Sequence, residues 1–383
     1  MNAPVYLDHA ATSWPKPPAV HRAVYDCMAR AGGNPGHGAH ALSDAAAQIV
    51  YDCRCALAKE FGASGPERVI FTAGATHALN LALHGALQKG DHVLCSDMEH
   101  NAVYRPLCEL QRRGVITFDT FLSPASDPRI GTARIVTDAA AKKKQNTRML
   151  VCSHMSNIVS SVMPLAALGA FCRRHGMLFC VDAAQSAGHL PIDMQQMQID
   201  LLCIPGHKGL YGLQGCGALI LGDGVTLTPL LQGGNGVFSL SGEMPELPPE
   251  RYEAGTLPTP AIAGLLAGLG NVQARGIGTI MAQDKHLYDR ARAMLAGFAG
   301  LHVCAPHCRG PVLLFYHDRI PSDALGAELD RRGICTRAGF HCTALGHGTL
   351  GTPDTGAVRV SFGMDTTPAD LDALYGAMKE ILL

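Results

Sequence analysis

Short apolar runs alternate with longer mixed segments through the middle of the chain. The apolar runs cover residues 68–72, 92–95, 116–121, 148–154, 177–182, 200–205 and 217–222. Their length and their content of Val, Ile, Leu, Phe and Cys are typical of buried strands. The segments between them, 75–88, 102–113, 132–143 and 164–175, are expected to be helices. This alternation predicts an α/β fold with a mostly parallel sheet buried between helices.

The pattern changes after residue 222. Residues 233–260 are rich in Gly and Pro and predict a long loop, a kind of segment that is usually functional. Helices are then expected at 260–273, 280–299, 322–332 and 368–382, with strands near 312–316 and 358–362. We therefore expect an N-terminal arm (1–15), a large domain (16–259) and a smaller α+β C-terminal domain (260–383). N-terminal helices near 17–31 and 43–61 would pack on the small domain or bridge to a partner subunit.

Composition excludes several classes of protein. Lys and Arg number 31 against 32 Asp and Glu, so the net charge of −1 provides no basic surface for nucleic acid. Charged residues make up 16% and hydrophobic residues 47%, which favours a large core over disorder. Apolar stretches such as 261–270 fall short of the roughly 18 residues that span a bilayer. No signal peptide is recognised, so we expect a cytoplasmic protein without a membrane partner.

Fourteen cysteines are spread along the chain without a CxxC pair, and we expect reduced thiols that mostly behave as small buried hydrophobes. Residues 304–308 (CAPHC) superficially suggest a metal site. No second ligand pair of matching spacing exists in the sequence, so no metal is expected. Cys342 differs from the others because it lies in a Gly-rich loop with His341 and His347, which could favour a thiolate.

Three features follow the ends of predicted strands, where parallel sheets bind ligands. The turn at 73–76 opens a helix and could hold a phosphate, although Gly and Thr also commonly cap helices. Asp182 ends its strand, and it either caps a helix or pairs with a buried cation. Lys208 lies in a Gly-rich loop, where desolvation makes an amine nucleophilic. A phosphate turn, a carboxylate and an amine in this order fit a pyridoxal-phosphate site.

At this point the sequence resembles the class V aminotransferases, and among them the cysteine desulfurase and selenocysteine lyase branch. The motifs that carry the resemblance run nearly end to end: 6–17, 34–40, 71–83, 97–103, 153–164, 181–193, 205–212, 252–260, 338–342 and 358–362. The resemblance implies a pyridoxal-phosphate enzyme of fold type I that forms a homodimer with sites at the subunit interface. The short loop around Cys342 is similar to that of SufS-like enzymes.

The resemblance also implies roles for single residues. Lys208 would bind the cofactor covalently, Asp182 would pair with its ring nitrogen, and His100 would stack on its ring. The other expected cofactor contacts are Gly74, Ala75, Thr76 and His207 at the phosphate, Asn157 and Gln185 near the ring hydroxyl, and Thr256 at the phosphate of the neighbouring subunit. Arg359 would pair with the substrate carboxylate. Asn34 and His341 would be further substrate contacts.

The implied activity is removal of sulfur from L-cysteine, which yields L-alanine and a persulfide on Cys342. An acceptor protein for sulfur or selenium is an expected partner. Three alternatives stay open: a selenocysteine lyase, an aminotransferase or epimerase that does not use Cys342, and a protein that chiefly relays sulfur. Pro205, Leu213, His37 and Asp365 depart from the family pattern, which affects substrate recognition more than the cofactor.

Overall fold

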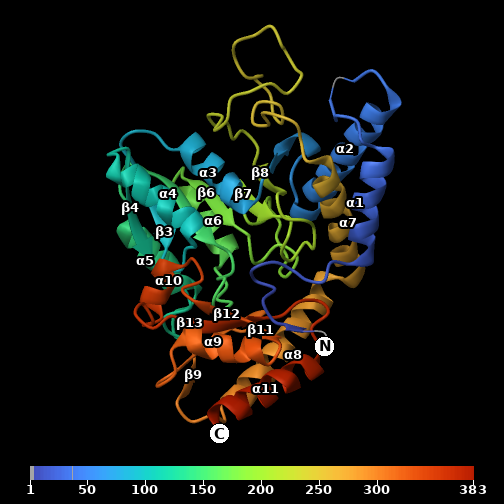
Figure 1. Ribbon diagram of the computed structural model, residues 1–383. Helices are drawn as coiled ribbons and strands as arrows, with labels where there is room; N and C mark the ends of the chain where they lie inside the picture. The colour runs from blue at the N-terminus through green and yellow to red at the C-terminus, as the bar shows by residue number, and fades with distance from the viewer. Residues whose placement is uncertain (1–3, 37) are drawn as a thin grey trace.

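The computed structural model describes residues 4–36 and 38–383, and its centre is a seven-stranded sheet between two layers of helices (Figure 1). The strand order is β2-β8-β7-β6-β5-β3-β4. The strands are β2 (Val69–Thr72), β3 (Asp91–Ser96), β4 (Ile116–Phe121), β5 (Thr147–Ser153), β6 (Leu178–Asp182), β7 (Leu201–Pro205) and β8 (Gly217–Leu221). β8 runs antiparallel to β2 and β7, and the other pairs are parallel. The predicted α/β fold with a mostly parallel sheet is confirmed.

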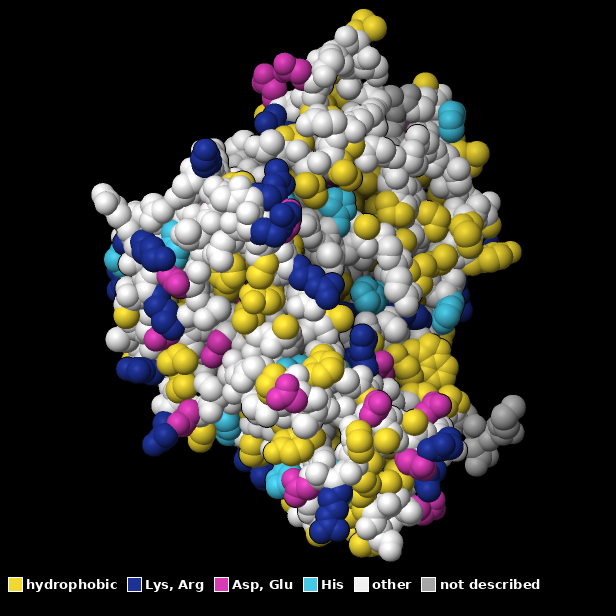
Figure 2. Space-filling view, turned by 60° about the vertical axis from the view of Figure 1, so that its left-hand side comes forward, with side chains coloured by type: hydrophobic (Ala, Val, Ile, Leu, Met, Phe, Trp, Pro, Cys, Tyr) yellow, Lys and Arg dark blue, Asp and Glu magenta, His cyan; other side chains and the backbone are white. Residues whose placement is uncertain are grey.

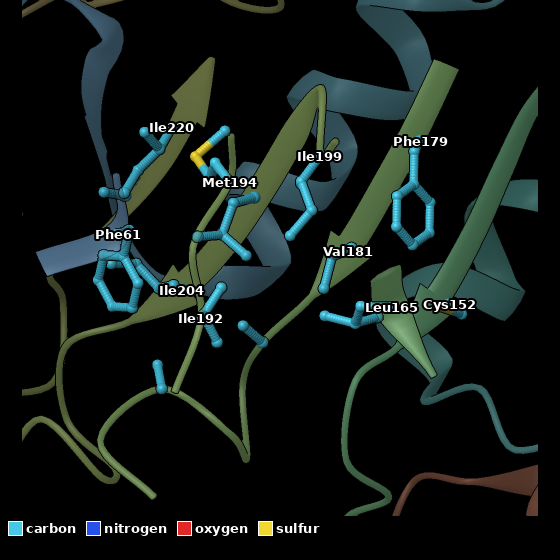
Figure 3. Packing of buried hydrophobic residues seen from close by; sticks show 14 of the residues in the cluster. Phe61, Cys152, Leu165, Phe179, Val181, Ile192, Met194, Ile199, Ile204 and Ile220 are labelled. Atoms are coloured by element: carbon cyan, nitrogen blue, oxygen red, sulfur yellow. The ribbon is translucent and has the colours of Figure 1, made fainter. Parts of the chain in front are cut away.

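Both faces of this sheet are buried, which explains why its strands are apolar without alternation. One face packs on α3 (Ala75–Ala86) and α4 (Asn101–Arg112), and the other on α2 (Ala41–Phe61), α5 (Thr132–Lys142), α6 (Leu165–Arg174) and α7 (Thr259–Arg275). Successive residues of β6 serve opposite layers: Phe179 and Val181 face the second, and Cys180 faces the first. Figure 3 shows Phe179 and Val181 of β6 in the same layer as Ile204 of β7 and Ile220 of β8.

The C-terminal part contains a four-stranded antiparallel sheet. Its order is β12 (Arg337–Gly339), β13 (Ala357–Ser361), β10 (Val312–His317), β9 (Leu301–Val303), and it packs with α8 (Ile277–Leu295), α9 (Ser322–Arg331) and α11 (Pro368–Leu382). The short helix α10 (Ala344–Thr349) follows Cys342. Strand β1 (Val5–Tyr6) pairs with β11 (Ile334–Cys335), so the N-terminal arm lies against the C-terminal part.

Helices α1 (Pro18–Arg30) and α2 lie against α7, as Figure 1 shows on the right. We expected the small domain to begin near the start of α7, and that boundary stays a prediction. Residues 222–258 contain no helix or strand and project at the top of Figure 1, in agreement with the expected long loop. No helix among the described residues is both long and apolar enough to cross a membrane.

The sequence pattern did not predict β1, β9, β11, β12 or α10. The four strands contain only two or three residues each, too few to show a period, and α10 contains six. The longer helices and strands were predicted to within a few residues because each carries several repeats of its hydrophobic pattern.

Candidate active site

A cavity of about 500 Å³ lies at the carboxyl ends of β5, β6 and β7. Five segments that are distant in the sequence meet in its wall. They contribute nine of the ten residues expected at a cofactor: Gly74, Ala75, Thr76, His100, Asn157, Asp182, Gln185, His207 and Lys208. Ser153 and Asn80 line the same cavity and were not predicted, although Ser153 ends its strand just as Asp182 does.

The N-terminus of α3 forms one wall of the cavity. Gly74 is the N-cap, with no side chain to cap the helix, and the first turn carries no acidic residue. Its φ of 146° requires glycine, and a Cβ on Gly217 would overlap Gly74. The first N–H groups of α3 and the positive end of its dipole are therefore available to an anion such as a phosphate.

Asp182 is buried at the end of β6, and its Oδ1 accepts the Ala184 N–H at 2.8 Å. Burial raises the pKa of this carboxyl, while the Ala184 N–H and the charge of Lys208 lower it. Among the described residues no protein group donates to Oδ2 of Asp182. That oxygen can pair with a protonated ring nitrogen.

Lys208 follows β7, and among the described residues its Nζ has neither a hydrogen bond nor an ion pair with protein atoms. Burial lowers the pKa of this amine to about 8; Asp182 opposes the shift, and Arg359 and Arg337 add to it. A larger fraction of Lys208 is therefore neutral and nucleophilic than for an exposed lysine. A Cβ on Gly188 would overlap the Gly209 carbonyl, so two glycine backbones pack directly beside this lysine.

The N-terminal arm and Lys16, which follows it, hold the Lys208 loop, a role that sequence analysis missed. The His207 carbonyl accepts from Lys16 Nζ at 2.9 Å and from Thr12 Oγ1 at 3.1 Å. Gln185 Nε2 donates to the Ala10 carbonyl at 2.9 Å and ties the opposite side of the cavity to the same arm. Burial, and to a smaller extent the charges of Lys208 and Lys16, lower the pKa of His207 to about 4, so its ring is neutral.

His100 caps the N-terminus of α4, where its Nδ1 accepts the Ala102 N–H at 3.0 Å. A neutral ring that accepts at Nδ1 carries its proton on Nε2. Burial lowers the pKa of His100 to about 4, and the charge of Lys208 lowers it further. Neutral His100 is thus suited to pack on an aromatic ring.

Glu99, next to His100, is fully buried and joins two strand ends. Its carboxyl oxygens accept the Ser153 N–H at 2.8 Å and Ser153 Oγ–H at 3.1 Å, and they also accept from Ser96 Oγ. Burial raises the pKa of Glu99 to about 8; Ser96 and Ser153 oppose the shift, and Asp182 adds to it. Sequence analysis missed Glu99, which stands in the quoted 97–103 motif.

Cys342 is exposed, whereas the other thirteen cysteines are buried or partly buried. It lines a second cavity of about 430 Å³. This cavity shares Thr76, Asn80, His100 and Ala102 with the Lys208 cavity. The thiol therefore lies in a space that adjoins the predicted cofactor site.

Arg359, on β13, is buried beside the site without lining its cavity. One terminal nitrogen donates to Asp8 at 2.6 Å and the other to the Asn157 carbonyl at 3.1 Å, while the buried Nε has no partner among the residues that the structure describes. Arg337, its register partner on β12, is exposed and lowers the pKa of Lys208 by its charge. Sequence analysis assigned no role to Arg337 or Asp8.

Three expected residues do not meet Lys208 within one chain. Asn34 and Thr256 line a separate cavity of about 340 Å³ beside α2. The His341 ring is buried under the Cys342 loop, bonded to the Arg337 carbonyl and His347, rather than exposed in the cofactor cavity. His37 lies outside the described residues.

Comparison with known proteins agrees with this geometry. The family described as aminotransferase class-V matches residues 5–374. A probable cysteine desulfurase of Methanothermobacter thermautotrophicus is 30% identical over 385 residues, covering 98% of this chain and 94% of that protein. The apo structure of a cysteine desulfurase from Thermococcus onnurineus superposes with a TM-score of 0.88 and 26% identity, covering 99% of this chain and 94% of that one. The structure of the Escherichia coli cysteine desulfurase CsdA superposes with a TM-score of 0.87 and 28% identity, covering 100% of this chain and 96% of that one. The chain belongs to the class-V aminotransferase family.

Proposed function

We propose that this protein is a pyridoxal-phosphate-dependent cysteine desulfurase that converts L-cysteine to L-alanine and leaves the sulfur on Cys342 as a persulfide. The observation that carries the proposal is the adjacency of two cavities, one lined by Lys208 and Asp182 and the other by the exposed Cys342. The similar proteins named cysteine desulfurase support it over nearly the whole chain.

The cavity suits pyridoxal phosphate at three points. The α3 N-terminus would hold the phosphate, Oδ2 of Asp182 would pair with the ring nitrogen, and the amine of Lys208 would bind the aldehyde. When bound, the cofactor supplies an aldehyde that condenses with amines and a ring that withdraws electrons from the Cα of the substrate.

The protein groups around the cavity would orient the amino acid and move its protons. The neutral amine of Lys208 is the base that takes and returns the Cα proton. Arg359 would bind the substrate carboxylate, while Asp8 and the Asn157 carbonyl hold the guanidinium plane. Burial keeps His100 neutral beside these groups.

Sulfur transfer needs no external oxidant or reductant, because the substrate donates the sulfur and Cys342 accepts it. The Cys342 thiol loses its proton, and a bond forms between its Sγ and the substrate sulfur as the Cβ–S bond of the substrate breaks. The carbon skeleton keeps the electron pair of that bond, takes up a proton and leaves as alanine. The outer sulfur of the persulfide then passes to an acceptor thiol, which restores the Cys342 thiol. The second cavity, with Arg105 and His84 in its wall, is the approach for that acceptor.

A homodimer is part of this proposal. Thr256 lies in a cavity away from Lys208 of its own chain, in a long segment whose Leu230 reaches the rim of the Lys208 cavity. Large apolar side chains are exposed along α1, α2 and this segment: Tyr25, Met28, Leu42, Tyr51, Leu231, Phe238, Leu240 and Leu247. Figure 2 shows hydrophobic side chains gathered on the right of its face. A second copy that covers this surface would bring its Thr256 toward the cavity.

The decisive experiment is a substrate panel of L-cysteine, L-selenocysteine, L-cysteine sulfinate and L-alanine, with alanine and sulfide or selenide measured. We expect alanine and a Cys342 persulfide from L-cysteine. Cys342→Ala should retain the cofactor absorbance but lose both products, and Cys108→Ala, in α4, should behave as wild type. In Lys208→Ala, borohydride should no longer fix the cofactor to the protein.

Each other outcome identifies an alternative. Release of selenide without release of sulfur would indicate a selenocysteine lyase. Undiminished alanine from L-cysteine in Cys342→Ala would remove Cys342 from the mechanism and favour an aminotransferase or epimerase. Turnover that occurs only with an acceptor protein present would favour a sulfur relay.

A further inference from the structure

The loop that carries Cys342 rests on a buried chain of side-chain hydrogen bonds. We propose that His347 and Thr352 are positioning residues for the Cys342 thiol, because together they fix the His341 ring beneath it in one orientation and one tautomer. The inference rests on the proposed function, since it concerns the step in which Cys342 accepts sulfur. His347 and Thr352 line neither cavity of the site, so any effect they have acts through the loop.

The donor and the acceptor of every hydrogen bond in this series can be deduced from the Arg337 carbonyl at its end. His341 Nε2 lies 3.0 Å from the Arg337 carbonyl, which can only accept, so Nε2 carries the proton. The Nδ1 of a neutral His341 must then accept, and its partner is His347 Nε2 at 3.2 Å. His347 therefore carries its proton on Nε2, and its Nδ1 accepts from Thr352 Oγ1–H at 2.8 Å. The chain runs one way, from Thr352 to the Arg337 carbonyl.

The three side chains that form these hydrogen bonds are buried away from solvent. His341 is 4% exposed, His347 1% and Thr352 2%. Burial lowers the pKa of both imidazoles, to about 3 for His341, where Arg359 adds to the effect. The two rings are nearly parallel with centroids 5.5 Å apart, and both are thus neutral near pH 7. His341 and His347 therefore help to fix the place of Cys342 and bring no positive charge to it. The sequence had suggested that they stabilise a thiolate.

The loop needs such support because its backbone is unusual. His341 has a φ of 51° and Cys342 a φ of 56°, so two successive residues with side chains adopt the left-handed conformation that favours glycine. Such conformations persist where the surroundings over-determine them. Here the turn sends the His341 ring inward and leaves Cys342 exposed.

The main chain of the loop is held from the other side. The Cys342 carbonyl accepts the Asn101 N–H of α4 at 2.7 Å. The His341 carbonyl accepts from Asn157 Nδ2 at 2.9 Å, and Asn157 Oδ1 accepts from Thr343 Oγ1–H at 2.7 Å. Asn157 therefore holds the main chain of His341, and the hydrogen bonds of the two rings hold its side chain. Loss of the hydrogen bonds between the two rings should free the side chain of His341, while the residues that line the cofactor cavity keep their positions.

Three substitutions test this inference. His347→Phe keeps a ring but removes both hydrogen bonds, Thr352→Val removes only the first donor, and His347→Gln retains one donor and one acceptor. Two rates are compared: persulfide formation on Cys342 in a single turnover with L-cysteine, and exchange of the Cα proton of L-alanine for deuterium. The second reaction needs the Lys208 cavity but not Cys342.

We expect His347→Phe to slow persulfide formation about 10- to 100-fold, because a small displacement of a reacting atom has effects of that size. Thr352→Val should slow persulfide formation less than His347→Phe does, and His347→Gln should recover part of the rate lost in His347→Phe. Deuterium exchange at Cα should stay within about twofold of wild type in all three variants, since they leave the cofactor cavity intact. The amides of residues 340–343 should also exchange with solvent faster in cofactor-free His347→Phe.

The matched control is His302→Phe. His302 lies on β9, at the opposite edge of the same four-stranded sheet from β12, where it pairs with Asp318 at 2.8 Å on the surface. It should leave both rates unchanged. Persulfide formation at the wild-type rate in His347→Phe would overturn the inference, and so would an equal fall of both rates. If wild type forms no persulfide at all, the proposed function fails, and amide exchange at 340–343 still decides whether the hydrogen bonds of the two rings hold the loop.

Discussion

Burial decides the protonation state of the individual residues at this site. It lowers the pKa of Lys208 to about 8 and those of His100 and His207 to about 4, and it raises the pKa of Glu99 to about 8. The shared cause is loss of hydration, which disfavours the charged form of each group. The site thus presents uncharged histidines and an amine that is partly neutral near pH 7, which suits nucleophilic and proton-transfer chemistry.

Glu99→Gln should make the melting temperature less dependent on pH. The carboxyl of Glu99 has a raised pKa in the folded protein, so between about pH 4.5 and 8 the folded chain keeps a proton that the unfolded chain has released. Wild-type stability should therefore fall as pH rises through this window, and the loss is complete above about 8. Gln cannot titrate, so the melting temperature of the variant should rise relative to wild type from pH 5 to pH 8.

The control for this prediction is Glu243→Gln, at an exposed position of the long 222–258 segment. Because this side chain is exposed to solvent, the substitution should leave the melting temperature close to that of wild type. A difference for Glu99→Gln that does not change with pH would contradict a raised pKa for this buried carboxyl.

At the scale of elements, glycines set how closely α7 approaches the loop after Lys208. A Cβ on Gly268 would overlap the Leu210 carbonyl and the backbone of Tyr211, whereas one on Gly270 would meet nothing within 4 Å. The two positions are two residues apart in one helix, so they share helix propensity and differ in their surroundings. The close approach at Gly268 keeps the Lys208 loop pressed against α7.

Substitution by alanine should therefore have opposite signs at these positions. Gly270→Ala should stabilise the protein by about 0.5–1 kcal/mol, because alanine loses less backbone entropy in a helix. Gly268→Ala should destabilise it by about 1–3 kcal/mol and weaken cofactor retention, because the added methyl forces the loop away. Thermal melting and the ratio of cofactor to protein after gel filtration measure both effects. A stabilising Gly268→Ala would show that the loop and helix do not pack this closely.

At the scale of the whole molecule, we expect a site assembled from two chains. Lys208→Ala and Thr256→Ala protein, unfolded and refolded together, should form hybrid dimers with one intact site and recover about a quarter of the wild-type sites. The matched control is Lys208→Ala mixed with Asp182→Asn. Both of those residues line the cavity of one chain, so no hybrid has an intact site and activity should not recover. A fully active monomer at assay concentration would contradict the dimer.

Three features of this site could be predicted from the pattern of the sequence because they follow the ends of regular strands, whereas the other cofactor contacts rested on the family resemblance. Asp182 ends β6, Lys208 follows β7, and Gly74 opens α3. Each strand shows its own hydrophobic pattern, and parallel strands bring their carboxyl ends to one edge whatever their exact order. Local sequence therefore determined both the fold class and the edge of the sheet at which the cavity lies.

Tertiary structure alone decided how these residues are supported. Lys16 reaches His207 across about 190 residues, Asp8 reaches Arg359 across about 350, and Asn157 reaches the carbonyl of His341 across 184 residues. No local period encodes such contacts, because each depends on where two remote segments meet in space. For the same reason, the direction of the His341 ring into the interior and of Cys342 outward could not be deduced from their adjacent places in the sequence.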